Sequence, residues 1–301
     1  MISFRHHVLT IVAVFLALAV GIVVGGGPLS DVGLSSAESE EPGGRDTGSD
    51  PRLEATQEAL GYAGTLSRTL GRGATQDALA DRPVALVRTP GAPDRRVGEL
   101  ETVVSDAGGS VTATYALTET LLSPGEKSLV DTLGSQLAAQ VEADGVEEDA
   151  STYVRLGQLL GRSAAAGGDE AADSDGTATA ILQGLVGGDL VRATDEEAGR
   201  APLVLVVLGE DLDEEADPIL SGLLEGLATS ARGVVTAGST TTGTDGVLAR
   251  VREGGGEIGS TVDGVEHGAG QVTTVLALAA AYDDTTGHFG AAGSDGVPPL
   301  G

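Results

Sequence analysis

The sequence predicts an α/β domain with a mostly parallel sheet, preceded by a single N-terminal transmembrane helix. The first observation behind this prediction is an uncharged apolar run from Val8 to Val24. The second is the alternation of short apolar strands with amphipathic helices after residue 80, a pattern typical of layered α/β folds. The third is the segment Pro202–Leu208, which is apolar throughout and fits a strand that is covered on both faces.

The apolar run predicts a membrane anchor. Thr10 is its only polar residue, and about 17–25 apolar residues suffice for a helix to cross a bilayer. Arg5 precedes the run and acidic residues follow it, so the positive-inside tendency keeps the N-terminus in the cytoplasm. We expect residues 1–27 to form a cytosolic tip and an anchor, which makes the chain a single-pass cell-membrane protein with an extracytoplasmic C-terminal domain. The alternative is a cleavable signal peptide, cut near Ala17–Ala19 or Gly25–Gly27, which exports the same domain.

Further segments flank the domain. Residues 28–51 are rich in glycine, proline and acidic side chains, which predicts a disordered acidic tether. Residues 52–72 predict a short stalk helix that begins at Pro51 after an Asp50 cap. Apolar side chains recur along it at roughly helical intervals, at Leu53, Leu60, Leu66 and Leu70. We expect the extracytoplasmic α/β domain over residues 80–290 and a disordered tail over residues 291–301.

The first half of the domain is predicted from apolar runs and helical spacing. A run bounded by Pro83 and Pro90 predicts a buried strand, and alternation after Ser110 predicts a second strand. Apolar side chains share one face of the helix between them, and Ser123–Glu126 has the composition of a turn and helix cap. In order, the predicted elements are strand 83–90, helix 94–107, strand 110–115 and helices 118–145 and 151–165.

The second half of the domain repeats the alternation after a polar acidic loop at residues 167–175. Its apolar strand 202–208 is the strongest strand signal in the chain, and Gly233–Gly238 predicts another strand after an intervening helix. In order, the predicted elements are helix 177–186, strand 202–208, helix 216–231, strand 233–238 and helices 244–253 and 272–282.

Composition narrows the classes of function. Acidic residues outnumber basic residues by 45 to 17, for a formal charge of −28. Because neutralising phosphates requires a basic patch, we expect no nucleic-acid partner. The acidic residues are spread along the chain, which favours a solvated surface adapted to high salt, with cation capture as the alternative. The chain has no cysteine, which excludes disulfides, thiolate catalysis and cysteine-ligated metals.

The sequence contains no signature of catalysis. It has no P-loop, no G-x-S-x-G, no H-E-x-x-H and no G-x-G-x-x-G after a strand. His267 and His288 are the histidines that follow the apolar run, and no local pattern joins either of them to a serine and an acid. We therefore expect a protein that is not an enzyme.

Two groups of residues follow predicted strands, where open parallel sheets bind their ligands. Arg88 and Ser239 form a possible cleft for an anion, unless Arg88 pairs with an acid and Ser239 caps a helix. The second group is spaced like the start of a calcium loop but lacks the required glycine and glutamate, so a solvated loop is the alternative. It consists of Asp211, Asp213 and Glu215.

Several segments resemble the actinobacterial copper transport protein family, whose members are similar to mycobacterial copper transport protein B. The resemblance covers nearly the whole chain, and the most specific segments are Met1–His7 and Gly287–Gly290. The other matching segments are Ala17–Gly25, Val84–Pro90, Gly109–Thr112, Ser260–Asp263 and Gly270–Leu278. The resemblance implies a membrane-associated envelope protein that limits intracellular copper through efflux. It also implies a link to cell division and cell-wall remodelling, made in the family through a coiled coil after the anchor.

Together these observations predict a membrane-anchored cell-envelope protein implicated in copper efflux and homeostasis, acting through metal buffering or transport. Copper(I) prefers thiolate and thioether ligands, and the only methionine is Met1, so His267 and His288 are the candidate ligands, for copper(II). The expected partners are the membrane, copper ions, and a second copy of the chain or envelope and division proteins. The alternative function is a non-transport envelope scaffold linked to cell division or cell-wall remodelling.

Overall fold

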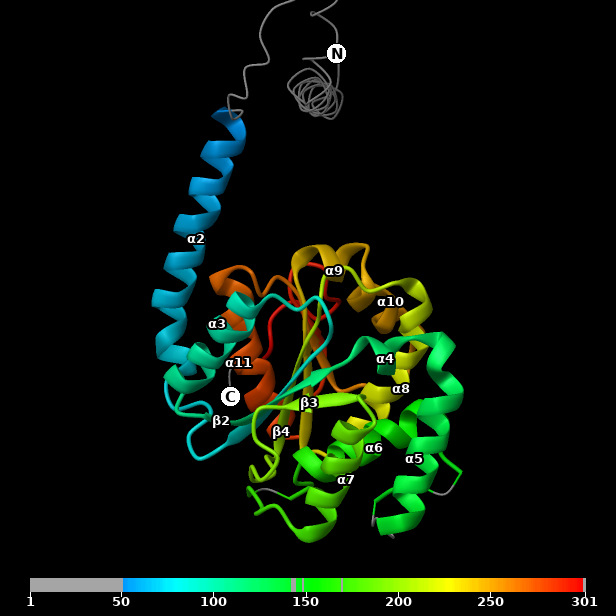
Figure 1. The fold of residues 1–301 in the computed structure, drawn as a ribbon. Helices are drawn as coiled ribbons and strands as arrows, with labels where there is room; N and C mark the ends of the chain where they lie inside the picture. Colours follow the sequence, from blue (N-terminus) through cyan, green and yellow to red (C-terminus); the bar gives the residue numbers. More distant parts are fainter. Residues whose placement is uncertain (1–50, 142–144, 148, 169, 300–301) are drawn as a thin grey trace, which may run out of the picture. The chain divides into compact units, whose positions relative to one another are not determined.

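A computed structural model of the chain describes residues 51–141, 145–147, 149–168 and 170–299 (Figure 1). The predicted anchor at residues 1–27 lies outside these residues, as does the predicted tether apart from Pro51. Among the helices of the described part, none is both long enough and apolar enough to cross a membrane.

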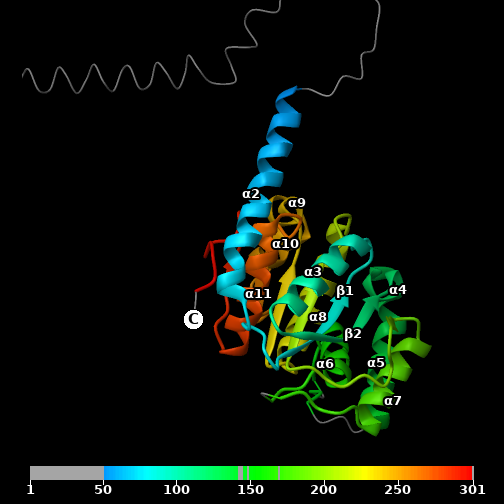
Figure 2. The same cartoon turned by 90° about the vertical axis from the view of Figure 1, so that its left-hand side faces the viewer.

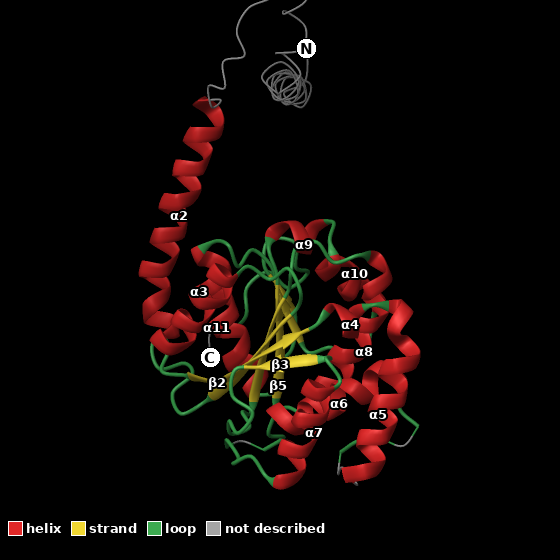
Figure 3. Cartoon of the chain, in the orientation of Figure 1, coloured by secondary structure: helices red, strands yellow, loops and turns green. Residues whose placement is uncertain are grey.

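One seven-stranded sheet runs through the described residues, with helices on both of its faces (Figure 3). The strands lie in the order β3-β2-β1-β4-β5-β6-β7, and each neighbouring pair is parallel except β2 with β3. Because the strand order reverses between β1 and β4, the topological switch point lies there. The bounds are β1 Pro83–Arg88, β2 Ser110–Leu117, β3 Val191–Ala193, β4 Leu203–Val207, β5 Gly233–Ala237, β6 Ser260–Val262 and β7 His288–Phe289.

Helices cover both faces of the sheet. On one face lie α3 (Asp94–Asp106) and α11 (Gly268–Tyr282), and α2 (Pro51–Thr75) packs against α11 (Figure 2). The opposite face packs against α4 (Glu119–Leu122), α5 (Lys127–Val141), α6 (Thr152–Ala164), α7 (Gly176–Gly187), α8 (Asp217–Ala228) and α10 (Val247–Gly254). The short helix α9 (Thr240–Thr244) follows β5, and the 3-10 turns Pro124–Glu126 and Glu214–Ala216 precede α5 and α8.

The two faces of the sheet build two aliphatic cores. Successive side chains of a strand point to opposite faces, so β1 places Val84 and Leu86 in one core and Ala85 and Val87 in the other. All four side chains are fully buried, as the run between two prolines predicts. The predicted α/β class with a mostly parallel sheet is confirmed.

The structure also corrects the predicted elements. The helix predicted over residues 118–145 is interrupted, because α4 ends at Leu122 and Pro124 begins a separate turn before α5. Proline lacks a backbone N–H and tends to start a helix rather than continue one. Strands β3, β6 and β7 were not predicted, and each has at most three residues.

Helix α2 packs on α11 through glycines. A Cβ atom on Gly268 would lie 2.2 Å from the carbonyl oxygen of Gly64, and a Cβ atom on Gly71 would lie 2.6 Å from the Val272 side chain. These contacts are too close for a side chain at either glycine. Away from this contact, α2 exposes large apolar side chains at Leu60, Tyr62, Leu66 and Leu70.

The edge of the sheet at β6 and β7 is held by a buried ion pair. Arg252 Nη1 lies 3.0 Å from Asp263 Oδ2, and the Asp263 side chain is 0% exposed. The Asp263 carboxylate also accepts hydrogen bonds from the backbone N–H groups of Ala291, at 2.8 Å, and Ala292, at 3.2 Å. Residues 291 and 292, which the sequence assigns to the tail, are therefore hydrogen-bonded to the domain.

Candidate functional site

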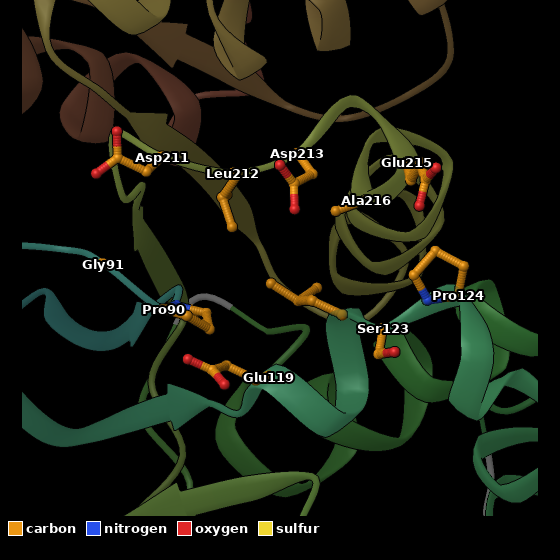
Figure 4. A pocket seen from close by; sticks show the side chains of 11 residues that line it. Pro90, Gly91, Glu119, Ser123, Pro124, Asp211, Leu212, Asp213, Glu215 and Ala216 are labelled. Atoms are coloured by element: carbon orange, nitrogen blue, oxygen red, sulfur yellow. The ribbon is translucent and has the colours of Figure 1, made fainter.

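Two adjoining cavities lie beyond the carboxyl ends of the strands: one at the switch point between β1 and β4, where α/β sheets usually bind ligands, and one beside it at the ends of β1 and β2. The acidic pocket has a volume of about 530 Å³ and is lined by Pro90, Gly91, Glu119, Ser123, Asp211, Asp213 and Glu215, among others (Figure 4). The arginine cleft has a volume of about 580 Å³ and shares Pro90, Gly91 and Glu119 with the acidic pocket. The other polar residues of the cleft are Arg88, Thr89, Thr118, Thr120, Asp189 and Arg192.

The loops after β1 and β4 touch through their backbones at this point. A Cβ atom on Gly209 would lie 2.0 Å from the carbonyl oxygen of Pro90, so only glycine fits there. The buried Thr89 hydroxyl accepts a hydrogen bond of 2.7 Å from the Gly209 N–H. Gly91 adopts a φ of 76°, in the left-handed region that favours glycine. This contact fixes the wall that the two cavities share.

The acidic pocket presents carboxylates from two segments. Glu119, at the start of α4, lies beside Pro90, and Asp213 and Glu215 lie on the loop that leads into α8 (Figure 4). No arginine or lysine lines the pocket, so its potential favours cationic groups. Within the described residues, no three histidine, aspartate or glutamate side chains gather closely enough to hold a metal ion. The acids spaced like a calcium loop, Asp211, Asp213 and Glu215, therefore line the acidic pocket without converging on one point.

The arginine cleft carries two guanidinium groups from strands on either side of β2. Arg88 ends β1, and its Nη1 lies 2.5 Å from Asp94 Oδ1 while its Nη2 donates to the Ala92 carbonyl oxygen at 2.8 Å. Arg192 lies on β3, and its Nη2 is 3.3 Å from Asp189 Oδ1. Both acidic partners are largely exposed, and exposed ion pairs contribute little stability.

The sequence predicts one possible cleft for Arg88 and Ser239, but Ser239 is not among the residues that line the cleft around Arg88. Ser239 is buried after β5, and its Oγ accepts a hydrogen bond of 3.3 Å from the Thr242 N–H at the start of α9. The structure instead brings Arg88 together with Arg192. Sequence analysis missed Arg192 because the three-residue strand β3 carries too short a pattern to predict.

The two candidate copper ligands lie near opposite ends of the parallel strands, one at the carboxyl ends and one at the amino ends. His267 lies in the loop between the carboxyl end of β6 and α11, and its Nε2 is 3.7 Å from Glu266 Oε1. His288 lies on β7 and lines a cavity of about 440 Å³ with Gly233 and Gly259, near the opposite ends of β5 and β6. Within the described residues, neither imidazole belongs to a group of three or more histidine, aspartate or glutamate side chains that could hold a metal ion.

His288 belongs to a chain of hydrogen bonds that favours its neutral form. Its Nδ1 lies 3.0 Å from Thr261 Oγ1, which already accepts a hydrogen bond of 2.7 Å from Arg252 Nε. The Thr261 hydroxyl can therefore donate to a neutral imidazole. Burial lowers the pKa of His288 below its ordinary value, the Arg252 cation lowers it further, and Asp295 opposes both.

We expect this lowered pKa to make the protein less stable in mild acid. The unfolded chain binds a proton at His288 near pH 6.5, whereas the folded chain resists it, so the free energy of unfolding should fall as the pH drops below about 6.5. Urea denaturation at a series of pH values measures the slope. His288→Gln should reduce this slope. His267→Gln should not, because the His267 side chain is partly exposed. Equal slopes in the wild type and His288→Gln would contradict the prediction.

Comparison with known proteins identifies the family. The family model described as "Copper transport outer membrane protein, MctB" matches residues 1–299. A protein named Copper transporter MctB from Mycobacterium tuberculosis (strain ATCC 25618 / H37Rv) is 30% identical over 310 residues, which cover 96% of each chain. The protein of the same name from Mycobacterium leprae (strain TN) is 30% identical over 300 residues, which cover 92% of each chain. The chain therefore belongs to the MctB family of copper transport outer membrane proteins.

Proposed function

We propose that this chain is a membrane-anchored cell-envelope protein that acts in copper homeostasis, on the route by which copper leaves the cell. The observation that carries the proposal is the family match over residues 1–299, together with relatives named copper transporters that align along 96% of the chain. The family description as an outer membrane protein supports membrane association. The role is related to transport rather than to catalysis.

The proposed arrangement along the chain follows the sequence. Residues 1–27 form the anchor, residues 28–51 the tether and residues 52–72 a stalk, and residues 80–290 form the extracytoplasmic domain ahead of the tail at 291–301. Support comes from the uncharged run Val8–Val24 and from Arg5 on its N-terminal side.

The absence of cysteine makes this topology testable with single introduced thiols. Ser128→Cys places a thiol on an exposed position of α5, and Ser3→Cys places one before the apolar run. We expect a membrane-impermeant maleimide to label Ser128→Cys in intact spheroplasts and Ser3→Cys only after permeabilisation. Labelling in the reverse pattern, or of neither variant before permeabilisation, would contradict the proposed orientation.

We propose that His267 and His288 each contribute a weak copper(II) contact rather than a shared centre. The described residues offer no sulfur ligand, and the two imidazoles lie near opposite ends of the parallel strands. Titration of the full-length chain with copper(II) should give binding weaker than micromolar, and His267→Ala and His288→Ala should each remove only part of it. Tighter binding that either single substitution abolishes would contradict two independent weak contacts.

The second candidate function is a non-transport scaffold for envelope or division proteins. Its support is the exposed apolar side chains on α2, which include Tyr62, Leu66 and Leu70. Such side chains on a helix beside a domain suit a partner protein.

A strain that lacks the gene separates the two functions. Copper hypersensitivity supports the role in copper homeostasis, whereas septation or cell-wall defects at normal copper tolerance support the scaffold. Complementation with the double variant Leu66→Ser, Leu70→Ser sharpens the test, because both side chains are exposed and their loss should leave the domain folded. The double variant should restore growth on copper under the first function and fail to restore septation under the second.

A further inference from the structure

We propose that the acidic pocket and the arginine cleft together bind one small zwitterionic ligand. In this site, Arg88 and Arg192 hold a carboxylate, and the acidic pocket holds the ammonium groups of the same molecule. The proposal concerns a ligand of the domain and does not rest on the proposed role in copper homeostasis.

The position of the two cavities is the first argument. The acidic pocket lies beyond the carboxyl ends of β1 and β4, at the switch point where open α/β sheets bind ligands, and the arginine cleft adjoins it at the carboxyl ends of β1 and β2. They share a wall formed by Pro90, Gly91 and Glu119, so one molecule can reach both. Their volumes of about 530 and 580 Å³ fall within the range of small-molecule sites.

The second argument is that both arginines form ion pairs with exposed acidic partners. Arg88 and Arg192 pair with Asp94 and Asp189, whose side chains are 88% and 64% exposed. Such pairs are readily exchanged, because water competes for both partners. A carboxylate in the cleft can accept two parallel hydrogen bonds from a guanidinium group, a stronger arrangement than a single exposed ion pair. Thr120 lines the same cleft, and its hydroxyl donates to Asp189 Oδ2 at 3.4 Å.

The acidic pocket sets the charge of the other end of the ligand. Its carboxylates include Glu119 on the shared wall and Asp213 across the pocket, with no basic side chain among them (Figure 4). Glu119 would repel a ligand that carries only negative charge. A bare metal ion is disfavoured as well, because these acids do not gather into a group that could hold one. A molecule with a carboxylate at one end and ammonium groups at the other satisfies both cavities.

Calorimetric titration of the full-length protein with trilysine tests the proposal. Trilysine carries ammonium groups and one carboxylate, and its C-terminal amide has the same backbone without the carboxylate. We expect trilysine to bind at least about tenfold more tightly than the amide, because each bidentate contact with an arginine adds about that factor. Arg192→Met should reduce the affinity for trilysine by about tenfold, because Arg88 still holds the carboxylate, and it should leave the affinity for the amide unaffected.

Two further variants make the test specific. Glu119→Gln should weaken binding of both peptides, because it removes charge from the wall that the cavities share. Arg95→Met, at an exposed arginine of α3, should change neither affinity. Equal affinities for trilysine and its amide, an absence of binding, or binding of trilysine that Arg192→Met leaves unchanged would overturn the proposal.

Discussion

Replacing Arg252 with methionine should lower the free energy of unfolding by about 3–5 kcal/mol, the usual cost of breaking a buried ion pair from one side. Arg252 pairs with Asp263 at 3.0 Å, and it also donates to Thr261 Oγ1 at 2.7 Å and to the Phe289 carbonyl oxygen at 2.9 Å. Methionine fills much of the volume but leaves the fully buried Asp263 carboxylate without a cation. Urea denaturation of the full-length protein, followed by circular dichroism, measures the loss.

Arg95→Met is the matched control for this substitution. Arg95 lies on α3 with its side chain 79% exposed, and its ion pair with Glu99 is a surface pair. Its loss should change the free energy of unfolding by less than about 0.5 kcal/mol. If Arg252→Met costs no more than Arg95→Met, the ion pair does not hold the β6–β7 edge of the sheet.

The same glycine-to-alanine change should have opposite effects on stability at Gly226 and Gly98. Gly226 of α8 packs against α6, and a Cβ atom there would lie 2.1 Å from the Val154 carbonyl oxygen and 2.6 Å from the Gln158 nitrogen. Both obstacles are backbone atoms, so the two helices must separate. We expect Gly226→Ala to lower the free energy of unfolding by about 1–3 kcal/mol or more, the usual cost of overpacking.

Gly98 provides the control within a helix. It lies in α3, and a Cβ atom there would meet no other atom within 4 Å. Gly98→Ala should therefore raise the free energy of unfolding by about 0.5–1 kcal/mol, because alanine favours the helix over glycine. Thermal unfolding of both variants measures whether each substitution raises or lowers the free energy of unfolding. A stabilised Gly226→Ala protein would show that α6 and α8 do not pack as closely as the structure indicates.

Long apolar patterns made most of the fold predictable. The run between Pro83 and Pro90 and the apolar segment Pro202–Leu208 correspond to the central strands β1 and β4. Strand β6 escaped prediction because its three residues, Ser260–Val262, are buried without being uniformly apolar. Strands β3 and β7 are shorter than any pattern that distinguishes a strand from a loop. Their places in the sheet depend on tertiary pairing with β2 and β6.

The candidate site was only partly predictable because it depends on how the strands are ordered and paired in the sheet. The sequence places Arg88 and Ser239 at the carboxyl ends of parallel strands, but it does not reveal the order of those strands in the sheet. The pairing register aligns Arg88 of β1, Ala116 of β2 and Arg192 of the unpredicted strand β3 in one row, and both arginines line the same cleft. The alternatives raised for the two residues are the contacts observed, since Arg88 pairs with Asp94 and Ser239 caps α9.

The central proposal, a membrane-anchored role in copper homeostasis, is tested most directly by the copper content of cells after a copper load. The measurement compares the wild type with a deletion strain that carries either the full chain or a chain lacking residues 1–27. We expect the deletion strain to retain more copper than the wild type. The full chain should restore the wild-type content, and the chain without the anchor should not. Equal copper contents in the wild type and the deletion strain would contradict the account.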